Sequence, residues 1–170
     1  KDVFFYLADL RKLAQGLSNL DAILALAFVS YSNGYVQPTF NDKKNILIIN
    51  GRHPVVEKRL QNSFIPNSTS LTDNEPFWII TGPNMGGKTT ALKTAGQLCQ
   101  LASFAIPLPA KEAELCLFDS IWFNREQDTA DSLSSFGREV VALAAALKQP
   151  GRSLFLLDEL AVVAELGHVG

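Results

Sequence analysis

The sequence has few of the residues that build metal centres or disulfide frameworks. Among its 170 residues are two cysteines and two histidines. Cys99 and Cys116 do not have the spacing of a metal-binding or redox pair, so we interpret both as small buried apolar residues in a reducing compartment. This predicts a cytoplasmic protein, or a nuclear one in a eukaryote. His53 has no other histidine or cysteine at ligand spacing, which favours a structural hydrogen bond over metal binding.

The sequence also lacks an excess of charge of one sign and a long apolar run. Fifteen basic and 17 acidic residues give a net charge of −2, so nothing indicates a surface for nucleic acid. No apolar run reaches 18 residues and no signal peptide begins the chain, so no membrane partner is expected. The single methionine is Met85, and we therefore expect the chain to be a piece of a longer protein.

The most informative stretch is the pattern G-x-x-x-x-G-K-[ST] at residues 82–89. The apolar run at 77–80 predicts a strand before it, and residues 88–105 predict a helix after it. Glycines allow backbone N–H groups to approach an anion, and the helix N-terminus favours phosphate. Lys88 can reach the β- and γ-phosphates of a nucleotide, and the hydroxyl of Thr89 can bind Mg²⁺.

A second acidic motif lies downstream. The apolar residues 153–157 predict a strand that ends in Asp158 and Glu159, which is typical of a Walker B motif. Asp158 would hold the Mg²⁺ shell, and Glu159 would orient the attacking water as a general base.

The remaining patterns predict an α/β domain that follows a helical connector. Residues 3–31 carry apolar positions at helical spacing and predict one or two amphipathic helices, with a break near residues 16–19. We therefore divide the chain into a connector at 1–31 and a domain at 32–170. Other expected elements are a buried strand at 46–49, a short helix or strand at 55–60, a polar connection at 68–75, one or two short strands at 114–122, a loop at 124–131 and a helix at 137–148.

Several motifs together resemble the ATPase domain of the MutS family, a branch of the ABC-type P-loop ATPases. The resemblance covers about residues 20–160, and its motifs occur in the family's order. They lie at residues 35–38, 51–55, 64–67, 81–88, 109–110, 134–139 and 158–160.

The resemblance implies a P-loop NTPase fold of ABC-ATPase type, with a mixed central sheet flanked by helices and an N-terminal helical connector. It implies ATP and Mg²⁺ as ligands. Phe64 would stack on adenine, Asn84 would contact the phosphate or water, and Ser134 would reach the nucleotide of a partner subunit. Catalysis would involve Glu159, Lys88 and Asn84, and the metal would be held by Thr89 and Asp158. The nucleotide-binding loop would comprise Gly82, Pro83, Asn84, Met85, Gly86, Gly87, Lys88, Thr89 and Thr90.

The sequence also departs from this family. The Gly-Arg-Gly-Thr run that usually follows the Walker B acids is absent after Glu159, so the domain is expected to be truncated at its C-terminal end. Thr89 stands where the family usually has serine, and Leu133 precedes Ser134 where mismatch-repair members usually have glycine. The subfamily therefore stays open.

Three functions are compatible with these observations. The first is ATP binding and hydrolysis by a MutS-type mismatch-repair protein, acting as a homodimer or family heterodimer and binding DNA through domains outside this chain. The second is a MutS-related ATPase that acts on branched DNA, ribosomes or another enzyme. The third is a non-catalytic nucleotide-binding or dimerisation module.

Overall fold

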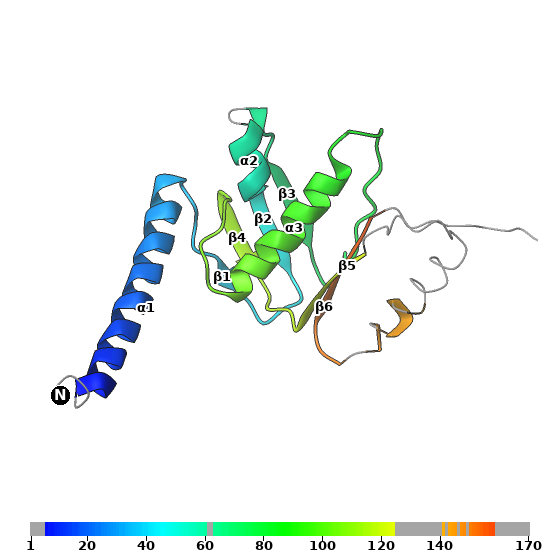
Figure 1. Cartoon of the computed structure of the whole chain (residues 1–170). Coiled ribbons are helices and arrows are strands. Elements are labelled where there is room, and N and C mark those ends of the chain that lie inside the picture. The colour runs from blue at the N-terminus through cyan, green and yellow to red at the C-terminus, as the bar shows by residue number, and fades with distance from the viewer. Residues whose placement is uncertain are drawn as a thin grey trace, which may run out of the picture.

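The protein is an α/β chain with one long helix that projects away from the sheets (Figure 1). The computed structural model describes residues 6–60, 63–124, 141, 143–145, 147–148 and 150–158. Its elements are α1 (Leu7–Ser32), β1 (Thr39–Phe40), β2 (Ile46–Gly51), α2 (Pro54–Leu60), β3 (Asn67–Leu71), α3 (Lys88–Ser103), β4 (Glu112–Leu115), β5 (Ser120–Asn124) and β6 (Ser153–Leu157).

The strands form two sheets. The larger one has the order β1-β4-β2-β3, in which β1 and β4 are parallel while β2 is antiparallel to both of its neighbours. The smaller one pairs β5 with β6 in parallel. The mixed α/β architecture is therefore confirmed, although the described strands lie in two sheets and not in one central sheet.

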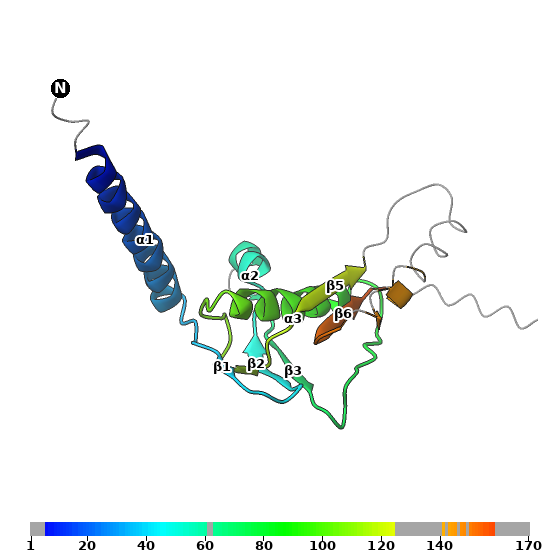
Figure 2. The same cartoon turned by 90° about the horizontal axis from the view of Figure 1, so that it is seen from below.

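Helix α3 packs on both sheets and carries much of the core (Figures 1 and 2). Leu98 is fully buried, and a Cβ added to Gly51 of β2 would lie 3.0 Å from its Cδ1 atom. On the other sheet, a Cβ added to Gly96 would overlap Cδ1 of Leu156 in β6. The fully or nearly fully buried residues around this helix are Ile46, Ile48, Leu98, Cys99, Ala102, Leu108, Ala110, Ala113, Leu115, Leu154 and Leu156.

The two cysteines are buried and unpaired, as predicted. Burial raises the pKa of the Cys99 thiol to about 12 and raises that of Cys116 as well. Both thiols are therefore protonated and act as small apolar groups at neutral pH.

Helix α1 is one continuous helix of 26 residues, so the predicted break near residues 16–19 is wrong. Gly16 lies within it with open space around it, and one glycine is tolerated in a long helix at a cost of about 1 kcal/mol relative to alanine. Within α1 only Ser30 is buried. This helix is long enough, and its mean hydropathy is high enough, to cross a membrane, although it contains no unbroken apolar run of that length. Core helices of soluble proteins and signal sequences meet the same criteria.

The strand predicted at residues 77–80 is also wrong. This segment has no regular structure, and Phe77 and Ile79 are 72% and 79% exposed. A short apolar run predicts a strand from local pattern alone, but a strand also needs a neighbouring backbone, and no described strand pairs with this one. Conversely, the polar residues of β3 pair with β2, although the sequence predicted a connection there.

Other predicted elements are confirmed by the described residues. They are the buried strand in β2, the strand β6, the helix α3, and two short strands where one or two were expected. The segment at 55–60 forms the helix α2. Residues 141, 143–145 and 147 are helical, whereas the rest of the predicted helix up to residue 140, and the predicted loop after Asn124, lie outside the described residues.

The contact between α3 and β6 gives a direct stability prediction. We expect Gly96→Val to lower the free energy of unfolding by about 1–3 kcal/mol, because the added methyl groups overpack Leu156. Gly16→Val should change it by less than about 0.5 kcal/mol, because Gly16 has no neighbour within 4 Å. Urea unfolding curves of both variants test this.

Leu156→Ala provides the control within the contact. If the account is correct, the combined Gly96→Val and Leu156→Ala variant loses less stability than the sum of the two single losses. Additive losses would mean that Gly96 and Leu156 do not pack against each other.

Candidate functional site

The loop at residues 82–89 lies at the N-terminus of α3 and is exposed up to Gly87. Met85 and Gly87 adopt left-handed backbone angles, with φ of 64° and 85°, and Gly87 is the N-cap of the helix. A Cβ on Gly86 would lie 2.9 Å from the carbonyl oxygen of Pro83, so the turn is closed by backbone. Turns of this kind direct successive N–H groups towards one side, where they can bind an anion.

The helix terminus leaves its own N–H groups available for such an anion. No side-chain hydrogen bond caps α3 among the described residues. The first acceptor within the helix is the carbonyl of Gly87, which accepts from the N–H of Ala91 at 2.8 Å. The preceding N–H groups and the positive end of the helix dipole therefore face the loop.

Lys88 places its ammonium group over this loop. Its Nζ atom donates to the carbonyl oxygens of Gly82 and Pro83, at 2.9 and 3.0 Å. These two hydrogen bonds hold its positive charge beside the loop. An anion bound at this loop would meet both this charge and the loop N–H groups.

Thr89 and Asp158 meet although they lie 69 positions apart. The Thr89 hydroxyl donates to Oδ1 of Asp158 at 3.2 Å, and the contact is partly buried. This pair joins the first turn of α3 to the end of β6.

The geometry of α3 on β6 explains this meeting. Thr89 lies seven residues before Gly96, which is two helical turns, so both face the same side of the helix. Asp158 lies two residues after Leu156, so both face the same side of the strand. Since Gly96 packs on Leu156, Thr89 comes to face Asp158.

The oxygen atoms of this pair suit a hard divalent cation. Hydroxyl and carboxylate oxygens are the ligands that Mg²⁺ prefers, and Mg²⁺ is usually held by one or two protein groups together with water and substrate phosphates. Among the described residues there is no group of three or more histidine, cysteine, aspartate or glutamate side chains that could hold a metal ion. The donor set therefore fits an ion that is bound jointly with a phosphate ligand.

The other residues predicted for the site are placed as follows. Asn84 and Met85 are exposed at the tip of the loop, and Phe64 is half-buried in the connection between α2 and β3. The carbonyl of Thr90 accepts from the Thr94 hydroxyl at 2.6 Å. Ser134 and Glu159 lie outside the described residues.

His53 has the structural role that the sequence favoured. Its Nδ1 atom accepts from the backbone N–H groups of Val55 and Val56, at 3.3 and 3.4 Å, at the start of α2. Burial lowers the pKa of His53, which favours the neutral ring that these contacts require.

Sequence reasoning missed two features of the site's scaffold. Gly96 inside a predicted helix was the available signal, because glycine there costs about 1 kcal/mol relative to alanine and therefore indicates a close packing contact. The ammonium of Lys93 lies 5.6 Å from the centroid of the Phe123 ring, and no local pattern indicates this pair.

Known proteins resemble this chain along most of its length. The family described as MutS domain V matches residues 78–164. A "DNA mismatch repair protein MutS" of Shouchella clausii is 38% identical over 164 residues, which are 94% of this chain and 19% of that protein.

Eukaryotic relatives match to the same degree. A "DNA mismatch repair protein msh3" of Botryotinia fuckeliana is 38% identical over 94% of this chain and 15% of that protein. A "DNA mismatch repair protein Msh3" of Mus musculus is 39% identical over 88% and 14%. The chain thus spans about a fifth or less of the length of these relatives. It belongs to the MutS family.

Proposed function

We propose that this chain is a P-loop ATPase module of ABC type that binds ATP and Mg²⁺ at the N-terminus of α3. The observation that carries the proposal is the 3.2 Å contact between Thr89 and Asp158, beside the ammonium of Lys88. A loop of N–H groups, a fixed cation and a hydroxyl–carboxylate pair together match the chemistry of a triphosphate with its metal ion.

Each residue then has a defined task. The loop N–H groups and Lys88 bind and orient the phosphates, while Thr89 and Asp158 hold the metal ion, which supplies charge neutralisation when it is bound. Phe64 stacks on the base, and Asn84 donates its amide to the phosphate or to water. Glu159, next to Asp158, accepts a proton from the water that attacks the γ-phosphate. Ser134 contacts the nucleotide of a partner subunit.

For the whole protein we propose DNA mismatch repair, because the similar proteins carry that name. In this proposal residues 1–31 connect the ATPase domain, at 32–170, to other domains that bind DNA. The ATPase domains pair as a homodimer or as a heterodimer within the family. Such a protein acts in the cytoplasm, or in the nucleus of a eukaryote.

A second candidate is a nucleotide-binding module without turnover. The sequence after Glu159 favours it, because residues 160–170 lack the Gly-Arg-Gly-Thr run of the family. A MutS-related ATPase outside mismatch repair is the third possibility. Preferential binding of heteroduplex over homoduplex DNA by the whole protein separates mismatch repair from that possibility.

Removal of the Lys88 ammonium tests nucleotide binding. We expect Lys88→Ala to weaken ATP affinity about tenfold or more, because a charged hydrogen bond to phosphate contributes about 1.5–3 kcal/mol. Titration with a fluorescent ATP analogue in the presence of Mg²⁺ measures the change.

Lys43→Ala is the matched control, since it removes the same charge from an exposed position between β1 and β2. Its affinity should stay within about twofold of the unmodified chain. Equal affinities for both variants and the unmodified chain would rule out the assigned phosphate site.

Turnover tests the proposed general base. We expect this chain to hydrolyse ATP slowly, and Glu159→Gln to reduce kcat by a further factor of about 10²–10⁴ while ATP still binds. Glu165→Gln, which makes the same change six positions later, should leave kcat unchanged. Brisk hydrolysis that Glu159→Gln leaves intact would contradict the role of Glu159.

A further inference from the structure

Three family motifs without an assigned task meet at the C-terminal end of α1. They are residues 35–38, 51–55 and 109–110. Val36 and Leu108 exchange two backbone hydrogen bonds, at 2.9 and 2.7 Å, and the N–H of Arg52 donates to the carbonyl of Pro109 at 2.8 Å. The chain leaving α1 is thus joined to the connection that follows α3.

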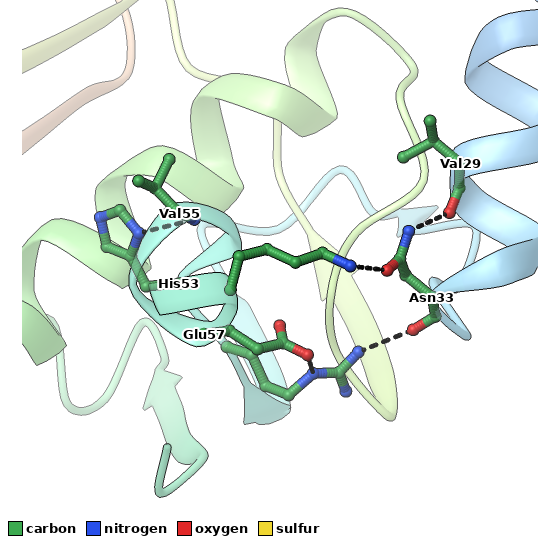
Figure 3. A network of polar contacts seen from close by, with 7 residues as sticks. Val29, Asn33, His53, Val55 and Glu57 are labelled. Carbon is green, nitrogen blue, oxygen red and sulfur yellow. Dashed lines mark hydrogen bonds and ion pairs between the residues drawn. The ribbon is translucent and has the colours of Figure 1, made fainter. Parts of the chain in front are cut away.

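The end of α1 depends on charges from another element. The last turn of this helix contains no basic residue, although the negative end of the helix dipole lies there. The Nη2 atom of Arg52 donates to the carbonyl of the C-cap residue Asn33 at 3.2 Å, and Nζ of Lys58 donates to its side-chain oxygen (Figure 3). Arg52, two residues before α2, and Lys58, in the last turn of α2, therefore supply the cations that α1 lacks.

Glu57 fixes the direction of the Arg52 side chain. The Nε atom of Arg52 donates to Oε1 of Glu57 at 3.1 Å, and the side chains are only 20% and 25% exposed (Figure 3). One guanidinium thus contacts both α1 and α2, which the planar, multiply donating arginine can do and the single ammonium of a lysine cannot.

In the part of the chain that the structure describes, little else fixes the direction of α1. Ser30 is its only buried residue, and the backbone bond from Tyr35 N–H to the Ser30 carbonyl, at 2.9 Å, also lies at its end. The leucines along the helix are exposed. The polar contacts at its C-terminus therefore carry most of the connection between α1 and the sheets.

We propose that Arg52 is a positioning residue, which holds α1 in one direction relative to the sheet that supports α3. Together with Asn33, Glu57 and Lys58 it forms the Arg52 junction. Gly51, the neighbour of Arg52, packs against Leu98 of α3, the helix whose first turn carries Lys88 and Thr89. The junction thus lies between α1 and the proposed nucleotide site. The positioning role of Arg52 does not depend on nucleotide binding, so it can be tested separately from the proposed function.

The distance between α1 and the sheet tests the proposal without nucleotide. Lys12→Cys in α1 and Lys111→Cys before β4 give two exposed labelling sites, while the native cysteines are buried. Pulsed electron–electron double resonance then gives the distribution of distances between the two spin labels in the complete chain. The variants are Arg52→Gln and Arg52→Lys, with Arg59→Gln as the control that removes the same charge from an exposed position of α2.

We expect a single narrow distribution for the unmodified chain and for Arg59→Gln. Arg52→Gln and Arg52→Lys should lose this narrow peak and become broad, with unfolding midpoints in urea that show both to be folded. If Arg52→Gln does not fold, Arg52→Lys alone decides. A narrow, unchanged distribution in the folded Arg52 variants would overturn the proposal, and so would equal broadening in Arg59→Gln.

The samples for these distance measurements contain no ATP. The measurements can therefore contradict the positioning role of Arg52 even if the chain binds ATP. ATP titrations of the same variants keep the two results separate. If the unmodified chain does not bind ATP, the proposed function is contradicted, while the positioning role of Arg52 is unaffected.

Discussion

The close packing of Gly96 on Leu156 sets the geometry on which the candidate site depends. A helix that lies this near a strand cannot shift or rotate without overlapping the leucine side chain. Side chains return to the same face after two turns of a helix and after two residues of a strand. Thr89 and Asp158 therefore lie on the same faces as Gly96 and Leu156, and they contact each other. Two residues that are distant in sequence thus form one pair of oxygen donors through a contact several residues away from them.

The same helix also ties the two sheets together. Leu98 packs next to Gly51 at the end of β2, while Gly96 faces β6, so α3 is buried on two sides. Beyond Gly51 the chain continues into Arg52, which contacts the C-terminal end of α1. A continuous series of packed and hydrogen-bonded residues therefore runs from the loop at 82–89 to α1. Under the proposed function, this series connects the phosphate-binding loop to α1.

Local patterns predicted the parts of this structure that local interactions determine. The glycine–lysine loop, the helix after it and the strand before Asp158 each have a residue pattern that predicts the element directly. The polar strand β3 was missed, because it is stabilised by pairing with β2 and not by its own residues. The expected strand at 77–80 fails for the converse reason, since its apolar residues have no described partner strand. The Arg52 junction joins Asn33, at the end of α1, to residues 52–58, and no spacing within one segment reveals a contact between two segments.

The central claim is that Thr89 and Asp158 bind one Mg²⁺ ion together with ATP. A double-mutant cycle on Mg²⁺-dependent ATP affinity, with Thr89→Val, Asp158→Asn and the double variant, tests it most directly. If both side chains hold the same ion, each single change removes most of the Mg²⁺ dependence, and the double change removes little more. Losses that simply add would place the two groups at independent sites, and unchanged Mg²⁺ dependence in all three variants would contradict the metal site.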